Sequence, residues 1–286
     1  MKQITIISGK GGTGKTTLTA GLAYFAENKV MADCDVDAAD LHLLLNPRVE
    51  QKHDFFSGQK YEINSDLCTQ CGKCRERCRY DAISHGSHID PISCEGCGAC
   101  YFVCPGKAIN RSEKLAGEYY ISSTKYGPFV HANLHIAEDN SGKLVAQVRK
   151  EALKIAAENQ AEHIIIDGPP GIGCPVNASL VGANLALVIT EPTLSGIHDL
   201  ERVLHLTKHF KITTRVVINK YDINQENTTA IRTICNRDNA PCIAVIPYNQ
   251  DILKAVIAGK VFPEAFPGHE VARTLKNIWE EIKNSD

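Results

Sequence analysis

The stretch Ser8-Gly9-Lys10-Gly11-Gly12-Thr13-Gly14-Lys15-Thr16-Thr17 decides the fold of this chain. It follows a short β-branched run, residues 4–7, and precedes a helical-looking run that starts at Leu18. The pattern G-x-x-x-x-G-K-[ST], placed between a strand and a helix, is the signature of a phosphate-binding loop. Glycines let successive backbone N–H groups point at one centre, and the following helix N-terminus adds partial positive charge. The stretch therefore predicts a site for the phosphates of a nucleotide.

The side chains of this loop have distinct expected roles. Lys15 should reach the β- and γ-phosphates, and the hydroxyl of Thr16 should ligate Mg²⁺. The alternative is a glycine-rich turn that binds nothing, which the complete motif and its two correct flanks disfavour. The expected nucleotide contacts in the loop are Gly11, Gly12, Thr13, Gly14, Lys15, Thr16 and Thr17.

A second lysine, Lys10, lies inside the loop just before the paired glycines. The sequence GKGGTGKTT resembles the deviant Walker A loop of the MinD/ParA/Mrp superfamily of P-loop ATPases, which includes the nitrogenase iron protein. In that class the early lysine contacts phosphate across a dimer interface. The resemblance therefore implies a nucleotide-dependent dimer, formed with a second copy or with a sister chain, in which Lys10 acts in trans.

Two acidic segments extend this resemblance. Asp33-Cys34-Asp35 and the residues after it look like the switch I segment of the class, which places Asp35 where the family orients the attacking water. Asp33 would then lie close to the Mg²⁺ and the phosphates. The apolar run 163–166 ends in Asp167-Gly168-Pro169-Pro170-Gly171, a Walker B pattern in which Asp167 holds Mg²⁺ through water. The alternative for Asp33 and Asp35 is a solvated acidic strand end, which their position beside a nucleotide loop disfavours.

The resemblance also indicates where the base would bind. Asn219 matches the residue that reads the adenine edge, and Pro247 begins the loop that closes over the base in the class. Asp222 resembles the guanine-reading aspartate of GTPases, so GTP stays open beside the favoured ATP.

Cysteine is the unusual part of the composition, because the 286 residues include 12 of them. Eight fall into two runs with the same spacing, C-x-x-C-x-x-C-x-x-x-C, which is an internal duplication. We read no export signal at the N-terminus, so this regular spacing favours metal binding over disulfides. The two runs are Cys68, Cys71, Cys74 and Cys78, then Cys94, Cys97, Cys100 and Cys104.

The duplicated runs resemble the bacterial ferredoxin with two [4Fe–4S] clusters. In that pattern three cysteines of a run hold one cube and the fourth crosses to the other cube. The departure is Arg79, which stands where the pattern has proline after the fourth cysteine. A pair of zinc knuckles is the alternative, but eight closely spaced cysteines exceed what tetrahedral zinc needs. The resemblance thus implies cluster one on Cys68, Cys71, Cys74 and Cys104, and cluster two on Cys94, Cys97, Cys100 and Cys78.

Strands that alternate with helices predict an α/β fold with a doubly wound, mostly parallel sheet. The cysteine runs lie between the P-loop and Asp167, so the ferredoxin-like α+β unit is an insertion. We expect residues 1–58 and 115–286 to form the P-loop ATPase domain and residues 59–114 the inserted unit. Residues 118–135 should form a hairpin on the return, and the C-terminal helix, about 269–283, should pack on the sheet rather than on a membrane.

Charge and hydropathy limit the partners. The net charge is −2, which gives no electrostatic case for nucleic acid or for an anionic membrane. No apolar run approaches the ~18 residues of a membrane span. We therefore expect a cytoplasmic protein.

Three functions compete. The first is an ATPase in which ATP-driven dimerisation gates electron transfer through two [4Fe–4S] clusters to an unidentified redox partner. The second is an iron–sulfur cluster carrier or assembly ATPase of the Mrp type, and the third is a spatial organiser like ParA or MinD. The inserted cysteine unit favours the first. Cys174 lies seven residues after Asp167, as a cluster-ligating cysteine does in the nitrogenase iron protein, but without the second cysteine of that protein.

Overall fold

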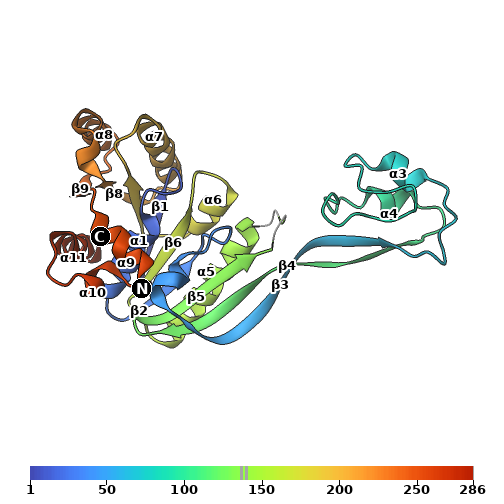
Figure 1. Ribbon diagram of the computed structural model, residues 1–286, viewed down its shortest axis with the longest axis horizontal. Coiled ribbons are helices and arrows are strands. Elements are labelled where there is room, and N and C mark those ends of the chain that lie inside the picture. The colour runs from blue at the N-terminus through green and yellow to red at the C-terminus, as the bar shows by residue number, and fades with distance from the viewer. Residues whose placement is uncertain (136–137, 139–140, 286) are drawn as a thin grey trace. The chain divides into compact units, whose positions relative to one another are not determined.

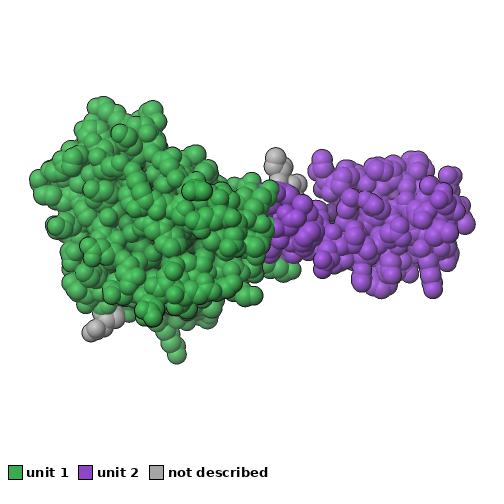
Figure 2. Space-filling model, turned by 90° about the horizontal axis from the view of Figure 1, so that it is seen from below, with its two compact units in different colours: residues 1–53, 119–133, 141–286 green, residues 54–118, 134–140 purple. Residues whose placement is uncertain are grey.

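The computed structural model describes residues 1–135, 138 and 141–285. The chain forms two compact units, drawn as a ribbon in Figure 1 and coloured separately in Figure 2. The large unit comprises Met1–His53, Tyr119–Asn133 and Ser141–Asp286, and the small unit Asp54–Glu118 and Leu134–Asn140. The small unit is thus longer than residues 59–114, because the strands that enter and leave it continue beyond those positions.

The described strands form one nine-stranded sheet in the order β3-β4-β5-β2-β6-β1-β7-β8-β9. All neighbouring strands from β5 to β9 in this order are parallel, as the sequence predicts. The strands are β1 (Lys2–Ser8), β2 (Lys29–Asp33), β3 (Arg48–Ile63), β4 (Ile109–Thr124), β5 (Gly127–Leu134), β6 (His163–Pro170), β7 (Leu185–Thr190), β8 (Thr213–Asn219) and β9 (Cys242–Ile246).

Helices cover both faces of this sheet, which makes it doubly wound (Figure 1). Apolar side chains of α1 and α11 pack on one face, and those of α6, α7 and α8 pack on the other. The helices of the large unit are α1 (Lys15–Phe25), α2 (Leu41–Leu45), α5 (Ser141–Glu158), α6 (Cys174–Leu180), α7 (Leu194–His209), α8 (Gln225–Arg237), α9 (Gln250–Ile257), α10 (Phe262–Ala265) and α11 (Glu270–Lys283), with a 3₁₀ turn η1 (Tyr221–Ile223).

The C-terminal helix packs on the sheet, as expected. Val271, Leu275, Ile278 and Ile282 of α11 are all buried, and they belong to the same core cluster as Ile4 of β1. This burial removes the apolar stripe of α11 from the protein surface. Across the described residues, no helix combines the length and the hydropathy that a membrane crossing requires.

The return hairpin is confirmed, but its first strand is much longer than the sequence indicates. β4 and β5 are neighbours joined by the two residues Lys125 and Tyr126, so they must run antiparallel. β3, which the sequence analysis missed, is a 16-residue strand that pairs with β4, also 16 residues long. Both strands contribute residues to both units.

The small unit has a compact apolar centre of its own. Two five-residue helices, α3 (Lys73–Arg77) and α4 (Ala99–Val103), lie within the two cysteine runs and contact each other. Buried residues between them and the strands form one cluster, namely Tyr61, Ile83, Ile89, Cys100 and Ile109.

Candidate functional site

The phosphate-binding loop lies between β1 and α1, as predicted. Gly14 precedes α1 with φ of 91°, which a side chain would strain. A Cβ atom at Gly14 would also lie 2.6 Å from Nδ2 of Asn219. That amide donates a hydrogen bond to the carbonyl oxygen of Thr13 at 2.8 Å. Glycine is therefore required at position 14, because the end of β8 supports the loop at this point.

Lys15 is buried against two carboxylates. Its Nζ lies 2.9 Å from Oδ1 of Asp167 on β6 and 3.3 Å from Oδ2 of Asp35, which follows β2. Burial opposes the positive charge, but the carboxylates outweigh it and raise the pKa of Lys15. Thr19, which the sequence analysis missed, donates to the same Asp167 oxygen at 2.9 Å. The predicted P-loop lysine, switch I and Walker B residues thus meet at one point.

Asp33 lies at the centre of this group rather than at its edge. It is fully buried, and strand register places it level with Asp167 on the neighbouring β6. Its oxygens accept hydrogen bonds from the backbone N–H groups of Asp35 at 3.0 Å and Leu41 at 3.2 Å. Burial, followed by the charge of Asp167, raises the pKa of Asp33 well above its ordinary value. Asp33 therefore holds the loop that presents Asp35.

Two buried oxygens at this site lack a partner among the described residues. They are Oδ2 of Asp167 and the hydroxyl of Thr13. An unpaired buried polar atom is costly in a folded protein, so such atoms commonly await a ligand, an ion or water. Thr16, three residues after Thr13, has a partly buried side chain. The arrangement leaves ligand positions where the sequence predicts Mg²⁺ and phosphate.

Lys10 bonds within its own chain in this structure. Its Nζ lies 2.5 Å from Oε1 of Glu191, which follows β7, and it also contacts the hydroxyl groups of Thr193 and Ser195. Oε2 of Glu191 takes a second lysine, Lys220, at 3.1 Å. Burial alone would raise the pKa of Glu191, but hydrogen bonds from the two lysines outweigh it and lower that pKa.

Glu191 is a site residue that the sequence analysis missed. The available signal was its position, because the carboxyl ends of parallel strands collect binding residues in open α/β sheets. Glu191 follows the last residue of β7, as Asp35 closely follows β2.

The residues predicted to bind the base, or their neighbours, make hydrogen bonds within the protein. Both polar atoms of the Asn219 side chain are used, one on Thr13 and the other on the N–H of Lys220 at 3.0 Å. Asp222 of η1 accepts the N–H of Tyr248 at 2.7 Å, which ties η1 to the loop that starts at Pro247. The adenine-reading role of Asn219 stays a prediction.

The eight cysteines of the small unit line two separate cavities. Each cavity takes three cysteines from one run and the fourth from the other run. The first cysteine cavity is lined by Cys68, Cys71, Cys74 and Cys104, and the second by Cys78, Cys94, Cys97 and Cys100. The polypeptide thus brings together the same two crossed sets that the ferredoxin resemblance implies.

The chain from residue 4 to residue 262 matches the model of the CobQ/CobB/MinD/ParA nucleotide binding domain. The chain belongs to this family. It is 34% identical over 284 residues to the uncharacterized protein MJ0578 of Methanocaldococcus jannaschii, covering 98% of this chain and 96% of that one.

Solved structures of family members share the fold. The cell division ATPase MinD of Pyrococcus furiosus aligns with a TM-score of 0.59 at 21% identity, covering 99% of this chain and 98% of the other. The septum site-determining protein MinD of Pyrococcus horikoshii, solved with Mg-ADP, aligns with a TM-score of 0.58 at 18% identity, covering 99% and 96%. These likenesses establish a MinD-like P-loop fold.

The cysteines outside the two runs come from separate parts of the sequence in this member of the CobQ/CobB/MinD/ParA family. Cys174 is exposed at the start of α6. Cys34 and Cys235 are buried, and Cys242 is half-buried. Within the described part of the chain, no three His, Cys, Asp or Glu side chains converge closely enough to hold a single metal ion.

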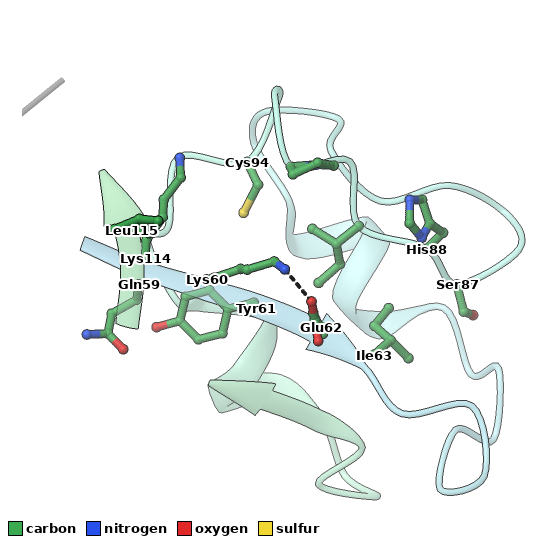
Figure 3. Close-up of a pocket in the computed structure, with 12 residues that line it drawn as sticks. Gln59, Lys60, Tyr61, Glu62, Ile63, Ser87, His88, Cys94, Lys114 and Leu115 are labelled. Carbon is green, nitrogen blue, oxygen red and sulfur yellow. Dashed lines mark ion pairs between the residues drawn. The ribbon is translucent and has the colours of Figure 1, made fainter. Parts of the chain in front are cut away.

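A larger hollow adjoins the second cysteine cavity (Figure 3). Tyr61, Ile89 and Cys94 line both, so the hollow and the cavity share a wall. The charged groups of the hollow are paired. Lys60 lies 2.5 Å from Glu62, and Lys114 lies 2.7 Å from Glu138.

Proposed function

We propose that this chain is an ATPase in which the nucleotide state controls electron transfer through two [4Fe–4S] clusters held by the small unit. The observation that carries the proposal is the pair of cysteine cavities within a chain of the MinD/ParA type. The cluster-binding part goes beyond the family, whose shared property is nucleotide binding.

The large unit fits MgATP. Lys15 presents its charge beside the loop whose backbone would cradle the phosphates, and Oδ2 of Asp167 is free to hold a Mg²⁺-bound water. Thr16 would supply the hydroxyl ligand of the metal, and Asp35 would orient the attacking water. Bound MgATP would supply negative charge that draws Lys15 away from Asp35, which releases that carboxylate for its role.

The small unit fits clusters better than single ions. In a [4Fe–4S] cluster each iron takes one thiolate, so four sulfur atoms surround a space rather than a point. The four cysteines of each cavity line such a space, and no described group converges on one ion as tetrahedral zinc requires. The backbone N–H of Lys73 lowers the pKa of Cys71, which favours the thiolate form. When bound, the clusters would supply one-electron transfer.

Dimerisation is the step that would connect the two functions. We propose that Lys10 exchanges its cis bond to Glu191 for the phosphate of a partner chain when both chains hold ATP. The bond to Glu191 would then represent the monomer, since Lys10 is satisfied there by one charged and two neutral partners. Light scattering of the purified, ATP-bound protein tests whether a second copy of this chain is the partner.

A cluster carrier or assembly ATPase is the second candidate. The observation that favours it is the exposure of Cys71 and Cys97, one in each cavity. Exposed ligands exchange more readily than buried ones. In contrast, Cys100 is buried, so an acceptor protein has less access to this ligand of the second cluster.

One comparison separates the two candidates. The protein is purified anaerobically, its iron and sulfide are counted, and its reduction potential is measured with and without MgATP. Retained clusters whose potential or acceptor reactivity changes with nucleotide support gated electron transfer. Transfer of the iron and sulfide to an apo-protein supports the carrier. Protein that binds no iron under these conditions would refute both, and light scattering of the ATP-bound sample reports the dimer.

A further inference from the structure

The two halves of the duplicated cysteine unit have similar backbone conformations, but their side chains differ in charge. Gly72 and Gly98 precede their helices with φ of 77° and 76°, and Cys78 and Cys104 end them with φ of −73° in both. The first half reads Lys73-Cys74-Arg75-Glu76-Arg77-Cys78-Arg79, and the second reads Ala99-Cys100-Tyr101-Phe102-Val103-Cys104-Pro105. Four basic residues in the first half therefore match four uncharged ones in the second.

Comparison of the two halves tests whether the fold needs the basic residues of the first half. The second half folds with no charged side chain in the stretch, so the fold does not require the charges of the first half. Arg79 is one of these basic residues, and it stands where the second half and the ferredoxin pattern have proline. A function outside folding is then the better explanation of the four basic residues.

The basic side chains are available for binding. Lys73, Arg77 and Arg79 are exposed, and no carboxylate of the described residues forms an ion pair with any of them. Arg75 is half-buried and contacts Nδ1 of His85 at 2.9 Å. Lys73 and Arg77 are four apart on α3, so they share one helix face.

These basic residues lie beside cysteines that the proposed function assigns to clusters. Lys73 precedes Cys74 of the first cysteine cavity, and Arg77 and Arg79 flank Cys78 of the second. Leu67, which lines the first cavity, is 55% exposed and Tyr80, which lines the second, is 48% exposed. Apolar groups among complementary charges are typical of a protein-binding surface.

We propose that Lys73, Arg77 and Arg79 form a docking strip for an acidic one-electron carrier protein, an inference that rests on the proposed function. Opposite charge would steer the carrier to the clusters and fix its orientation. A protein fits better than a nucleic acid. Residues 54–118 hold eight basic and nine acidic residues, so the segment as a whole has no excess of positive charge, and its acidic groups would repel a long polyanion.

The electron transfer itself is balanced. A reduced carrier gives one electron to one cluster of this chain, so the carrier is oxidised by one electron and the cluster is reduced by one. No bond forms or breaks, and no proton has to move.

The test uses a small acidic bacterial ferredoxin, reduced with dithionite, mixed anaerobically with the full-length, cluster-loaded protein in a stopped-flow instrument. The variant is Arg77→Glu with Arg79→Glu. The control is Lys150→Glu with Lys276→Glu, which gives the same change of net charge on exposed positions of α5 and α11. Iron content and visible absorption are measured for each protein first.

For the parent we expect a second-order rate that falls as ionic strength rises from about 20 mM to about 500 mM. The Arg77/Arg79 variant should be slower by about tenfold or more at low salt, whereas the control stays within about twofold. Equal slowing of the two variants, or a parent rate that does not depend on salt, would overturn the proposal. Tighter binding of a single-stranded 30-mer oligonucleotide than of the ferredoxin by the parent, under the same salt, would overturn it in favour of nucleic acid.

Failure of the docking strip can be told apart from failure of the proposed function. Binding of oxidised ferredoxin, measured by calorimetry, needs no electron transfer. If the parent holds no iron, the proposed function fails, but ferredoxin binding that the Arg77/Arg79 variant loses and the control retains still supports the strip. If iron is present and the calorimetry shows no such difference, the strip alone is refuted.

Discussion

His42 of α2 stacks on His131 of β5, with ring centroids 6.0 Å apart and 8° between the ring planes. α2 begins at Leu41, whose N–H binds Asp33 in the nucleotide site. His131 also stacks on Tyr120 of β4, with ring centroids 5.0 Å apart, and β4 is one of the two strands shared with the small unit. A continuous set of contacts within the large unit therefore links the nucleotide site to β4.

The first prediction tests this link. His42→Ala should leave ATP hydrolysis within about threefold of the parent, because His42 touches none of the catalytic candidates, but it should reduce the effect of MgATP on the cluster potential. The control is His53→Ala, which removes the stack of His53 on Tyr119, 4.8 Å away, without touching α2. An unchanged response to MgATP in His42→Ala would show that the coupling does not pass through this stack.

A second prediction follows from the burial of His131. Burial, helped by the charge of His42, lowers the pKa of His131 from 6.5 to about 4. The folded protein therefore binds fewer protons than the unfolded chain between these values, so stability is present above pH 6.5 and is lost as the pH falls toward 4. The loss attributable to this group is about 3 kcal/mol. Urea unfolding at several pH values should show a smaller decline for His131→Phe than for the parent, and parallel curves would refute the assignment.

A third prediction concerns Lys15 among the carboxylates of the nucleotide site. Lys15→Met keeps most of the side-chain volume but leaves Asp33, Asp35 and Asp167 without their cation, and we expect a loss of about 3 kcal/mol at neutral pH. Burial already raises the pKa of Asp33, so this group takes up a proton more readily as the pH falls. The difference from the parent in urea should therefore be smaller at pH 5 than at pH 8. A difference that grows on acidification would contradict this account.

A fourth prediction separates the two lysines on Glu191. Lys10→Ala should abolish ATP-dependent dimerisation and lower kcat by about 100-fold or more, because the trans contact to phosphate would be lost. Lys220→Ala removes the other ion pair of Glu191 and serves as the control, which should still dimerise. Light scattering with a slowly hydrolysed ATP analogue measures the dimer. Hydrolysis by Lys10→Ala at the parent's rate would eliminate the trans role.

Local sequence patterns predicted much of the fold because the responsible forces are local or periodic. The loop at Gly14 and the buried stripe of α11 are examples. β3 was missed because most of its side chains are exposed, so no alternation of apolar and polar residues marks it. Its partner β4 starts 46 residues after β3 ends, and such pairing leaves no local signal.

In the candidate site, too, local motifs were predicted and long-range contacts were not. Lys15, Asp35 and Asp167 were predicted because each belongs to a recognisable motif, whereas the ion pair of Lys10 with Glu191 was not, since 181 positions separate the two residues. Strand register, which places Asp33 beside Asp167, is also set by the folded sheet. The sequence therefore predicts which chemical groups are present more readily than how they pair.

The crossed arrangement of cysteines makes the last prediction, and it uses two double variants that differ only in the second position. Cys68 and Cys104 line the same cavity but come from different runs, whereas Cys68 and Cys78 come from the same run but line different cavities. If four cysteines of one cavity hold one cluster, Cys68→Ser with Cys104→Ser should damage one cluster and keep about four irons per chain. Cys68→Ser with Cys78→Ser should damage both clusters and keep far less iron. Iron and sulfide analysis of anaerobically reconstituted protein measures the outcome, with the visible spectrum as a second readout. The reverse order of iron contents would mean that each run holds its own cluster, and equal contents would mean that the cavities do not bind clusters independently.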